Sequence, residues 1–106
     1  ENHKTTPIGV LSPIYSCHRE KEKNMHGHTL EEFRRWNREA CELLQEAGDS
    51  RLFYFNGLNL LGADDKERLP DTIHPDNMGY SLIGDRASET VLPILLNHLQ
   101  GVPYVP

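Results

Sequence analysis

The chain has 106 residues, of which 37% are hydrophobic and 25% are charged, and these values fit one small globular domain. Its formal net charge of −5 argues against a surface for nucleic acid or for an anionic membrane. No apolar run approaches the roughly 20 residues that a membrane-spanning helix needs, so we expect a soluble protein, with its compartment unknown. The chain starts at Glu1 without an initiating Met or a signal peptide, which indicates a mature form or a fragment.

The first predicted element is a strand within residues 7–15, after a polar lead-in over residues 1–6. Its core, residues 8–11, is a continuous apolar run, which favours a strand buried on both faces of a parallel sheet. Pro13 limits how far the strand can pair. Residues 16–28 are charged and too long for a simple turn, so we expect an exposed loop.

A helix is predicted next, with Thr29 as its N-cap and Glu32 completing a capping box. It runs to about residue 47, where Gly48 suits the position after the helix end. The apolar residues at helical spacing are expected to face the core; they are Phe33, Trp36, Ala40, Leu43, Leu44 and Ala47. The charged residues are expected to face solvent; they are Glu31, Arg34, Arg35, Arg38, Glu39 and Glu42.

Residues 51–56 form a second predicted strand, rich in aromatic side chains. A loop over residues 57–68 follows, and its three leucines require part of it to fold back onto apolar surface. A helix then begins near Asp76 or Asn77, is kinked or split at Pro93, and ends at Gly101. Its predicted buried residues are Leu82, Ile83, Ala87, Val91, Ile94 and Leu95. Residues 102–106 are an extended tail.

The resulting order, β-loop-α-β-loop-α, predicts an α/β fold in which the two strands are parallel and joined by a right-handed crossover. Two parallel strands do not make a stable sheet by themselves, because parallel sheets occur with more strands and with both faces covered. The sequence therefore predicts part of a larger α/β domain.

The strongest functional signal is an acid and an imidazole three residues apart, Asp71 and His74, in a loop stiffened by Pro70 and Pro75. A histidine can act as general base near neutral pH, and a carboxylate can orient it and stabilise its charged form. The pair follows the carboxyl end of the second strand, which is the edge where open α/β sheets carry their sites. The alternative is an acidic loop that feeds a helix capped by Asp76.

Three serines are candidates for the nucleophile of this pair, Ser12, Ser16 and Ser50, and none of them is convincing. Ser50 lies in Gly48-Asp49-Ser50-Arg51-Leu52, which approaches the nucleophile signature Gly-Asp-Ser-Leu. It precedes the second strand, however, which puts it roughly 17–20 Å from the loop with His74, beyond the reach that catalysis requires. Ser12 and Ser16 are nearer to the working edge, but neither follows a strand-to-helix elbow.

Other polar residues have weaker interpretations. His18, His26 and His28 do not match a strong zinc spacing, so we expect a solvated loop rather than a metal site. The neighbouring acids Asp64 and Asp65 are expected to form an exposed acidic loop. The two cysteines, Cys17 and Cys41, do not make a disulfide framework and fit a reducing compartment. We expect no cofactor and no metal.

Asp71-Thr72-Ile73-His74-Pro75, with Asp76, Asn77, Gly79 and Tyr80, resembles the last conserved block of the SGNH (GDSL-type) hydrolases. Residues 8–14, 52–62 and 83–86 resemble that family's fourth strand, its fifth strand with the following loop, and the start of its closing helix. The resemblance covers about residues 7–98. It implies a flavodoxin-like α/β/α sandwich and ester hydrolysis through an acyl-enzyme, with His74 as the catalytic base and Asp71 as its orienter.

The blocks of that family that carry the nucleophilic serine and the oxyanion hole have no counterpart in this sequence. The resemblance therefore implies that residues 1–106 are the C-terminal part of a single hydrolase domain and are inactive alone. The implied partners are an ester substrate, either acetylated carbohydrate or a short-chain ester, and a missing N-terminal half or a second copy that covers the sheet edge. No nucleic acid or membrane partner is expected. The alternative is a non-catalytic α/β interaction module that pairs through an exposed strand edge.

Overall fold

The structure, a computed structural model, describes residues 5–101. Its elements follow the predicted order, with two short 3₁₀ helices added between the second strand and the second helix. In chain order they are β1 (Ile8–Leu11), α1 (Leu30–Glu46), β2 (Leu52–Phe55), η1 (Gly57–Asn59), η2 (Ala63–Arg68), α2 (Asn77–Thr90) and α3 (Leu92–Gln100). The predicted tail over residues 102–106 and residues 1–4 of the lead-in lie outside the described residues.

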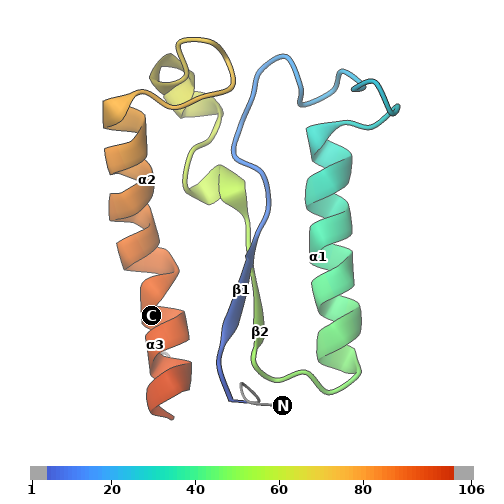
Figure 1. The fold of residues 1–106 in the computed structure, drawn as a ribbon, viewed down its shortest axis with the longest axis vertical. Coiled ribbons are helices and arrows are strands. Elements are labelled where there is room, and N and C mark those ends of the chain that lie inside the picture. The colour runs from blue at the N-terminus through green and yellow to red at the C-terminus, as the bar shows by residue number, and fades with distance from the viewer. Residues whose placement is uncertain (1–4, 102–106) are drawn as a thin grey trace.

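The two strands pair in parallel, with Ile8 opposite Leu52 and Leu11 opposite Phe55. Figure 1 shows α1 on one side of the strands and α2 with α3 on the other. The chain therefore has a small α/β fold in which helices flank two parallel strands, and this much of the predicted fold class is confirmed. None of the helices within residues 5–101 is both long and apolar enough to cross a membrane.

The face of the sheet that looks toward α3 carries Phe53 and Phe55 of β2. The ring of Phe53 packs edge-on against His98 of α3, with 5.3 Å between the ring centroids. Gly9 of β1 leaves room for the ring of Phe55, because a Cβ at this position would stand 3.0 Å from it. Side chains alternate between the faces of a strand, so Leu52 points to the opposite face, where it is buried.

Three of the buried apolar side chains, Leu60, Leu61 and Leu69, lie in the segments beyond the carboxyl end of the strands, and the other two, Leu52 and Cys41, come from the start of β2 and from α1. The leucines of residues 57–68 do fold back, as predicted. The signal for η1 was present in the sequence, because the side chain of Asn56 accepts a hydrogen bond from the backbone N–H of Leu58 and caps the turn. Asn at such a position is a known cap residue.

Helix α1 begins with the predicted capping box: the Thr29 hydroxyl accepts from the Glu32 N–H at 3.1 Å, and the Glu32 carboxylate accepts from the Thr29 N–H at 3.2 Å. The predicted burial of this helix is wrong for Arg34 and for most of the apolar stripe, whereas the other charged residues are exposed or half-buried as expected. Arg34, expected in solvent, is only 6% exposed, whereas Leu43, expected in the core, is 67% exposed. The apolar stripe of α1 is thus largely uncovered by the described residues; its exposed members are Trp36, Ala40, Leu43, Leu44 and Ala47.

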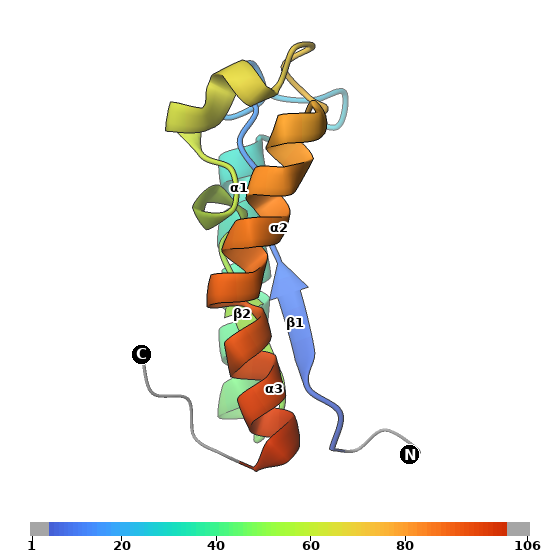
Figure 2. The ribbon, with the colours of Figure 1, turned by 90° about the vertical axis from the view of Figure 1, so that its left-hand side faces the viewer.

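Strand β1 has an open edge. Its pairing with β2 uses the Ile8 N–H, which donates to Arg51 O at 2.8 Å, and extends to the Ser12 N–H, which donates to Phe55 O at 3.0 Å. Peptide groups alternate in direction along a parallel strand, so those of Gly9 and Leu11 point away from β2. The sheet of residues 5–101 has no third strand, and Figure 2 shows β1 at one edge of the molecule.

The C-terminal helical segment is split as Pro93 predicted. Helix α2 ends at Thr90, α3 starts at Leu92 with Pro93 in its first turn, and Gly101 closes α3 in the left-handed region at φ 71°. At the other end, the Asp76 carboxylate caps α2 by accepting from the Gly79 N–H at 2.7 Å. This cap fixes where the preceding loop, residues 69–76, meets the helix.

Candidate active site

The loop of residues 69–76 lies at the carboxyl end of the strands, between η2 and α2 (Figure 1, yellow to gold). The turn that contains Ser50 joins α1 to β2 at the opposite end of the strands (Figure 1). The strand direction inferred from the sequence therefore holds, and Ser50 does not share an edge of the sheet with the acid and base.

Asp71 and His74 contact each other directly. Asp71 Oδ1 accepts hydrogen bonds from the backbone N–H of Ile73 at 2.9 Å and of His74 at 2.6 Å. Asp71 Oδ2 lies 2.6 Å from Nδ1 of the His74 ring. An Asp side chain that binds the backbone N–H two residues on is a recurrent turn former, and here the same turn brings the imidazole to the carboxylate.

The electrostatics of the pair follow from these contacts. The backbone N–H of His74, the His74 side chain and the backbone N–H of Ile73, in that order, hold the pKa of the Asp71 carboxyl well below its usual range. Asp71 is therefore ionised near neutral pH, and its charge favours a proton on Nδ1 of His74. Nε2 is then the basic nitrogen, on a side chain that is 72% exposed.

The loop holds one strained residue. Thr72 has φ 70°, a left-handed conformation that is unusual for a β-branched side chain and costs about 1–3 kcal/mol. Its N–H donates to Leu69 O at 2.9 Å, and its carbonyl accepts from the Ser16 hydroxyl at 2.7 Å. Contacts on both sides thus keep Thr72 in a conformation that it would not adopt alone.

Ser12 and Ser16 are buried, and their hydroxyl groups already have partners. Ser12 Oγ lies 2.9 Å from the Tyr54 hydroxyl and accepts from the Gly57 N–H at 3.0 Å, while Ser16 Oγ donates to Thr72 O. Both serines therefore hold the loops at the carboxyl end of the strands together. Sequence reasoning placed them near this edge but did not identify these contacts, because their partners are 42 to 56 residues away in the chain.

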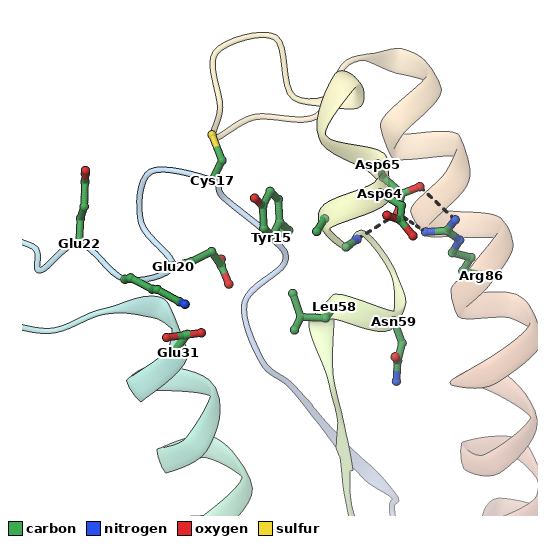
Figure 3. A pocket seen from close by; sticks show the side chains of 13 residues that line it. Tyr15, Cys17, Glu20, Glu22, Glu31, Leu58, Asn59, Asp64, Asp65 and Arg86 are labelled. Atoms are coloured by element: carbon green, nitrogen blue, oxygen red, sulfur yellow. Dashed lines mark hydrogen bonds and ion pairs between the residues drawn. The ribbon is translucent and has the colours of Figure 1, made fainter.

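Two cavities lie at the same end of the molecule. The larger, about 900 Å³, opens between the segment after β1 and the η1–η2 segment (Figure 3), where Tyr15, Cys17 and Leu58 line it. The smaller, about 580 Å³, is lined by Thr72 and Ile73 of the loop 69–76 and by several side chains of residues 18–33. Asp71 and His74 line neither cavity, but the smaller one reaches the two residues between them.

The acidic segment also differs from a fully solvated loop. Asp65 accepts from the Arg86 guanidinium at 2.6 Å and from the Gly62 N–H at 3.0 Å. These bonds, the one to Arg86 first, lower the pKa of Asp65, and they connect η2 to α2.

Within residues 5–101, no three His, Cys, Asp or Glu side chains are grouped so as to hold a metal ion. Cys41 is buried and Cys17 is exposed.

No protein-family model matches this chain, and no curated protein matches it. Among solved structures it is similar to the salicylyl-acyltransferase SsfX3 from a tetracycline biosynthetic pathway, with 26% sequence identity and a TM-score of 0.70. The match covers 87% of this chain and 29% of that chain. The described chain thus spans under a third of the length of the protein that it resembles.

These findings correct the family assignment made from the sequence. The resemblance to the SGNH (GDSL-type) hydrolases rested on short blocks, and no family model matches them, while the similar solved structure is an acyltransferase rather than a hydrolase. The assignment to that family is therefore wrong. The similar structure is that of a transferase that acts on acyl groups.

Proposed function

We propose that this chain supplies the proton-transfer pair of an enzyme that moves acyl groups through an acyl-enzyme. The observation that carries the proposal is the 2.6 Å contact between Asp71 Oδ2 and His74 Nδ1 on an exposed loop at the carboxyl end of the strands. In this role, Nε2 of His74 takes the proton of a nucleophilic hydroxyl as its oxygen attacks the acyl carbon. The protonated ring then returns the proton to the leaving group, while ionised Asp71 stabilises the imidazolium.

The second half of the reaction repeats these steps with an acceptor. His74 removes a proton from the acceptor hydroxyl, the acceptor oxygen attacks the acyl-enzyme, and the nucleophile recovers its proton. If the acceptor is water, the result is ester hydrolysis; if it is another alcohol, the result is acyl transfer. We propose that the nucleophile is a serine. We also propose that the enzyme can hydrolyse esters, because the same base serves water and an alcohol as acceptors.

We place the nucleophile and the oxyanion-hole donors on a segment outside these 106 residues. The hydroxyl groups of Ser12 and Ser16 have partners, and Ser50 lies at the opposite end of the strands. The 29% coverage of the similar acyltransferase supports this division, because most of that chain has no counterpart here. On this proposal, the 106-residue chain alone has no useful activity.

We further propose that the complete domain is a flavodoxin-like α/β/α sandwich, and that its missing part covers the open edge of β1. The open peptide groups of Gly9 and Leu11 would accept a further parallel strand. The exposed apolar stripe of α1, with Leu43 67% exposed and Leu44 52% exposed, would pack against that part. The missing part is the rest of the same domain or, as the other option, a second copy of the chain.

The substrate on this proposal is an ester, either a short-chain ester or an acetylated carbohydrate. The similar acyltransferase is named for a salicylyl group, which extends the range of acyl groups to aromatic ones. The smaller cavity supports a compact acyl group, because Leu30, Phe33 and Ile73 give it apolar walls close to the loop that holds His74.

The open edge of β1 favours a second candidate, a non-catalytic module that binds a partner strand by extending the sheet. The two functions differ in what they require of His74. A strand-binding module keeps its function without the imidazole, because Gly9 and Leu11 supply the contacts, whereas acyl transfer does not.

The test is acyl transfer from an activated aryl acetate to water and to a small alcohol, measured on the polypeptide of the complete reading frame. We expect His74→Ala to lower kcat by at least about 10³-fold, as the loss of a general base does in serine enzymes. The matched control is His26→Ala, which removes an imidazole from an exposed loop and should leave kcat unchanged. Full activity of His74→Ala would refute the proposed function.

A further inference from the structure

A series of buried polar contacts joins helix α1 to the loop that holds Asp71 and His74. It starts at Arg34, whose guanidinium donates to Pro13 O at 2.8 Å and to Ile14 O at 2.9 Å. The same guanidinium binds the Glu20 carboxylate through two hydrogen bonds, of 2.6 and 2.8 Å. Arg34 thus fixes the segment after β1 at three points, with the planar, two-pronged geometry that arginine provides and lysine does not.

The series continues through Ser16. Glu20 Oε2 accepts from the Ser16 N–H at 3.0 Å, so the carboxylate that Arg34 holds also holds the backbone of Ser16. The Ser16 hydroxyl then donates to Thr72 O at 2.7 Å, across 56 residues of sequence. Ser16 is 5% exposed, so water has little access to compete for this carbonyl.

The effect on the acid follows from the planarity of the peptide bond. The carbonyl of Thr72 and the N–H of Ile73 belong to one peptide unit, and a trans peptide points them in opposite directions. Ser16 holds the carbonyl end of this unit, and the N–H end donates to Asp71 Oδ1 at 2.9 Å. Without the Ser16 hydroxyl, this peptide unit can rotate about the Cα–C bond of Thr72 and the N–Cα bond of Ile73, and the Ile73 N–H then no longer points at Asp71 Oδ1.

We propose that Ser16 and Arg34 are positioning residues for the Asp71–His74 pair: they fix the peptide unit between Thr72 and Ile73, which aims the Asp71 carboxylate at the His74 ring. The relevance of this role to acyl transfer rests on the function proposed above. Neither residue touches the reacting atoms. Their role is to hold the loop in a conformation that Thr72 opposes.

The test uses ¹³C NMR to follow the Asp71 carboxyl group through an acid titration. The Ile73 N–H is among the groups that lower the pKa of Asp71. We expect Ser16→Ala to raise the Asp71 pKa toward that of an ordinary aspartate, by about one unit, which is a tenfold change in proton affinity. The ion pairs of this loop are Asp71 with His74, and Asp76 with Arg68 of η2 at 3.5 Å. The Ser16→Ala substitution replaces none of these four residues.

The matched control is Ser12→Ala. Ser12 is a buried serine of the same segment, and its hydroxyl binds Tyr54 and Gly57 rather than the loop with Asp71. It should destabilise the fold without moving the Asp71 pKa, so the control separates positioning from general stability. A second variant, Arg34→Lys, keeps the charge but loses the two-pronged bond to Glu20, and should raise the Asp71 pKa by a smaller amount.

The proposal is overturned if Ser16→Ala leaves the Asp71 pKa unchanged, or if Ser12→Ala moves it equally. If Ser16→Ala does not fold, Arg34→Lys decides: an unchanged Asp71 pKa in that variant overturns the proposal, and a raised one supports it. The titration needs no substrate, so its outcome is independent of the activity of His74→Ala. The positioning role and the acyl-transfer function can therefore fail separately.

Discussion

The two most informative regions of this molecule are opposites in composition and in burial. At the carboxyl end of the strands, a polar cluster of Arg34, Glu20, Ser16 and Ser12 is largely removed from solvent and hydrogen-bonded throughout. Along the side of α1, an apolar stripe is exposed. The comparison shows that the described chain encloses the polar groups beside its candidate site but leaves the apolar stripe of α1 exposed.

We expect the largest effect from a substitution at Arg34, the centre of the buried polar cluster. Arg34→Met leaves the Glu20 carboxylate, whose side chain is 13% exposed, without its partner, and leaves two carbonyl groups without donors. We expect a loss of about 3–5 kcal/mol in the free energy of unfolding, as is typical when one member of a buried pair is removed, measured by urea denaturation. The control is Arg38→Met on the same helix, whose exposed pair with Glu42 at 3.6 Å should contribute at most about 1 kcal/mol. Equal losses in the free energy of unfolding from the two variants would show that the buried cluster contributes no more to stability than an exposed ion pair.

A second pair of variants compares a buried leucine with an exposed leucine of the α1 stripe. Leu61 is 0% exposed and Leu43 is 67% exposed. We expect Leu61→Ala to lower the free energy of unfolding by about 2–5 kcal/mol, and Leu43→Ala to change it by no more than about 0.5 kcal/mol. Thermal unfolding of both variants supplies the measurement. A large loss from Leu43→Ala would mean that the stripe of α1 is covered in solution, by a partner copy or otherwise.

Two glycine substitutions compare a tightly packed position with an open one. Gly57 lies under the carbonyl groups of Ser12 and Pro13, where a Cβ would collide with backbone atoms, whereas Gly84 in α2 has open space around it. We expect Gly57→Ala to cost about 1–3 kcal/mol through overpacking. Gly84→Ala should instead stabilise the protein by about 0.5–1 kcal/mol, because alanine favours a helix. Chemical denaturation of the two variants would contradict the account if Gly57→Ala were neutral.

Acid should lower the free energy of unfolding by a smaller amount. The pKa values of Asp65 and Asp71 are lowered in the folded state, so near pH 4 the unfolded chain binds more protons at these positions than the folded chain does. Their contribution to stability is therefore complete above the pKa of an unfolded aspartate, about 3.9, and is lost as the pH falls below it. Thermal unfolding between pH 6 and pH 2.5 measures this, and Asp65→Asn, which retains the shape of the side chain, should flatten the pH dependence.

The sequence predicted those features of the fold that depend on local chemistry. The Thr29–Glu32 capping box, the break at Pro93 and the end at Gly101 each depend on a few neighbouring residues. The turn that joins Asp71 to His74 is local too, since its hydrogen bonds span two or three residues. Local patterns of this kind can be recognised in the sequence without knowledge of the rest of the fold.

The sequence did not predict which side of α1 is buried, because that depends on distant contacts. Periodicity identified the apolar stripe, but within residues 5–101 the sheet beside α1 has two strands. The buried side of the helix is the one that carries Arg34, which binds the segment after β1, and Cys41. The burial of Arg34 depends on carbonyl groups 20 and 21 residues away. Likewise, no local signal relates Ser16 to Thr72. The assignment to a hydrolase family failed because it rested on a few short blocks within residues 7–98, which match no family model.

The central claim is that His74 serves a nucleophile that these 106 residues do not contain. The most direct test is to treat the polypeptide of the complete reading frame with a fluorophosphonate, which reacts with activated serines, and to locate the adduct by peptide mass mapping. The account predicts one adduct on a serine outside the present sequence, and its loss in His74→Ala. An adduct on Ser12, Ser16 or Ser50, labelling that persists in His74→Ala, or the absence of any adduct would contradict the account.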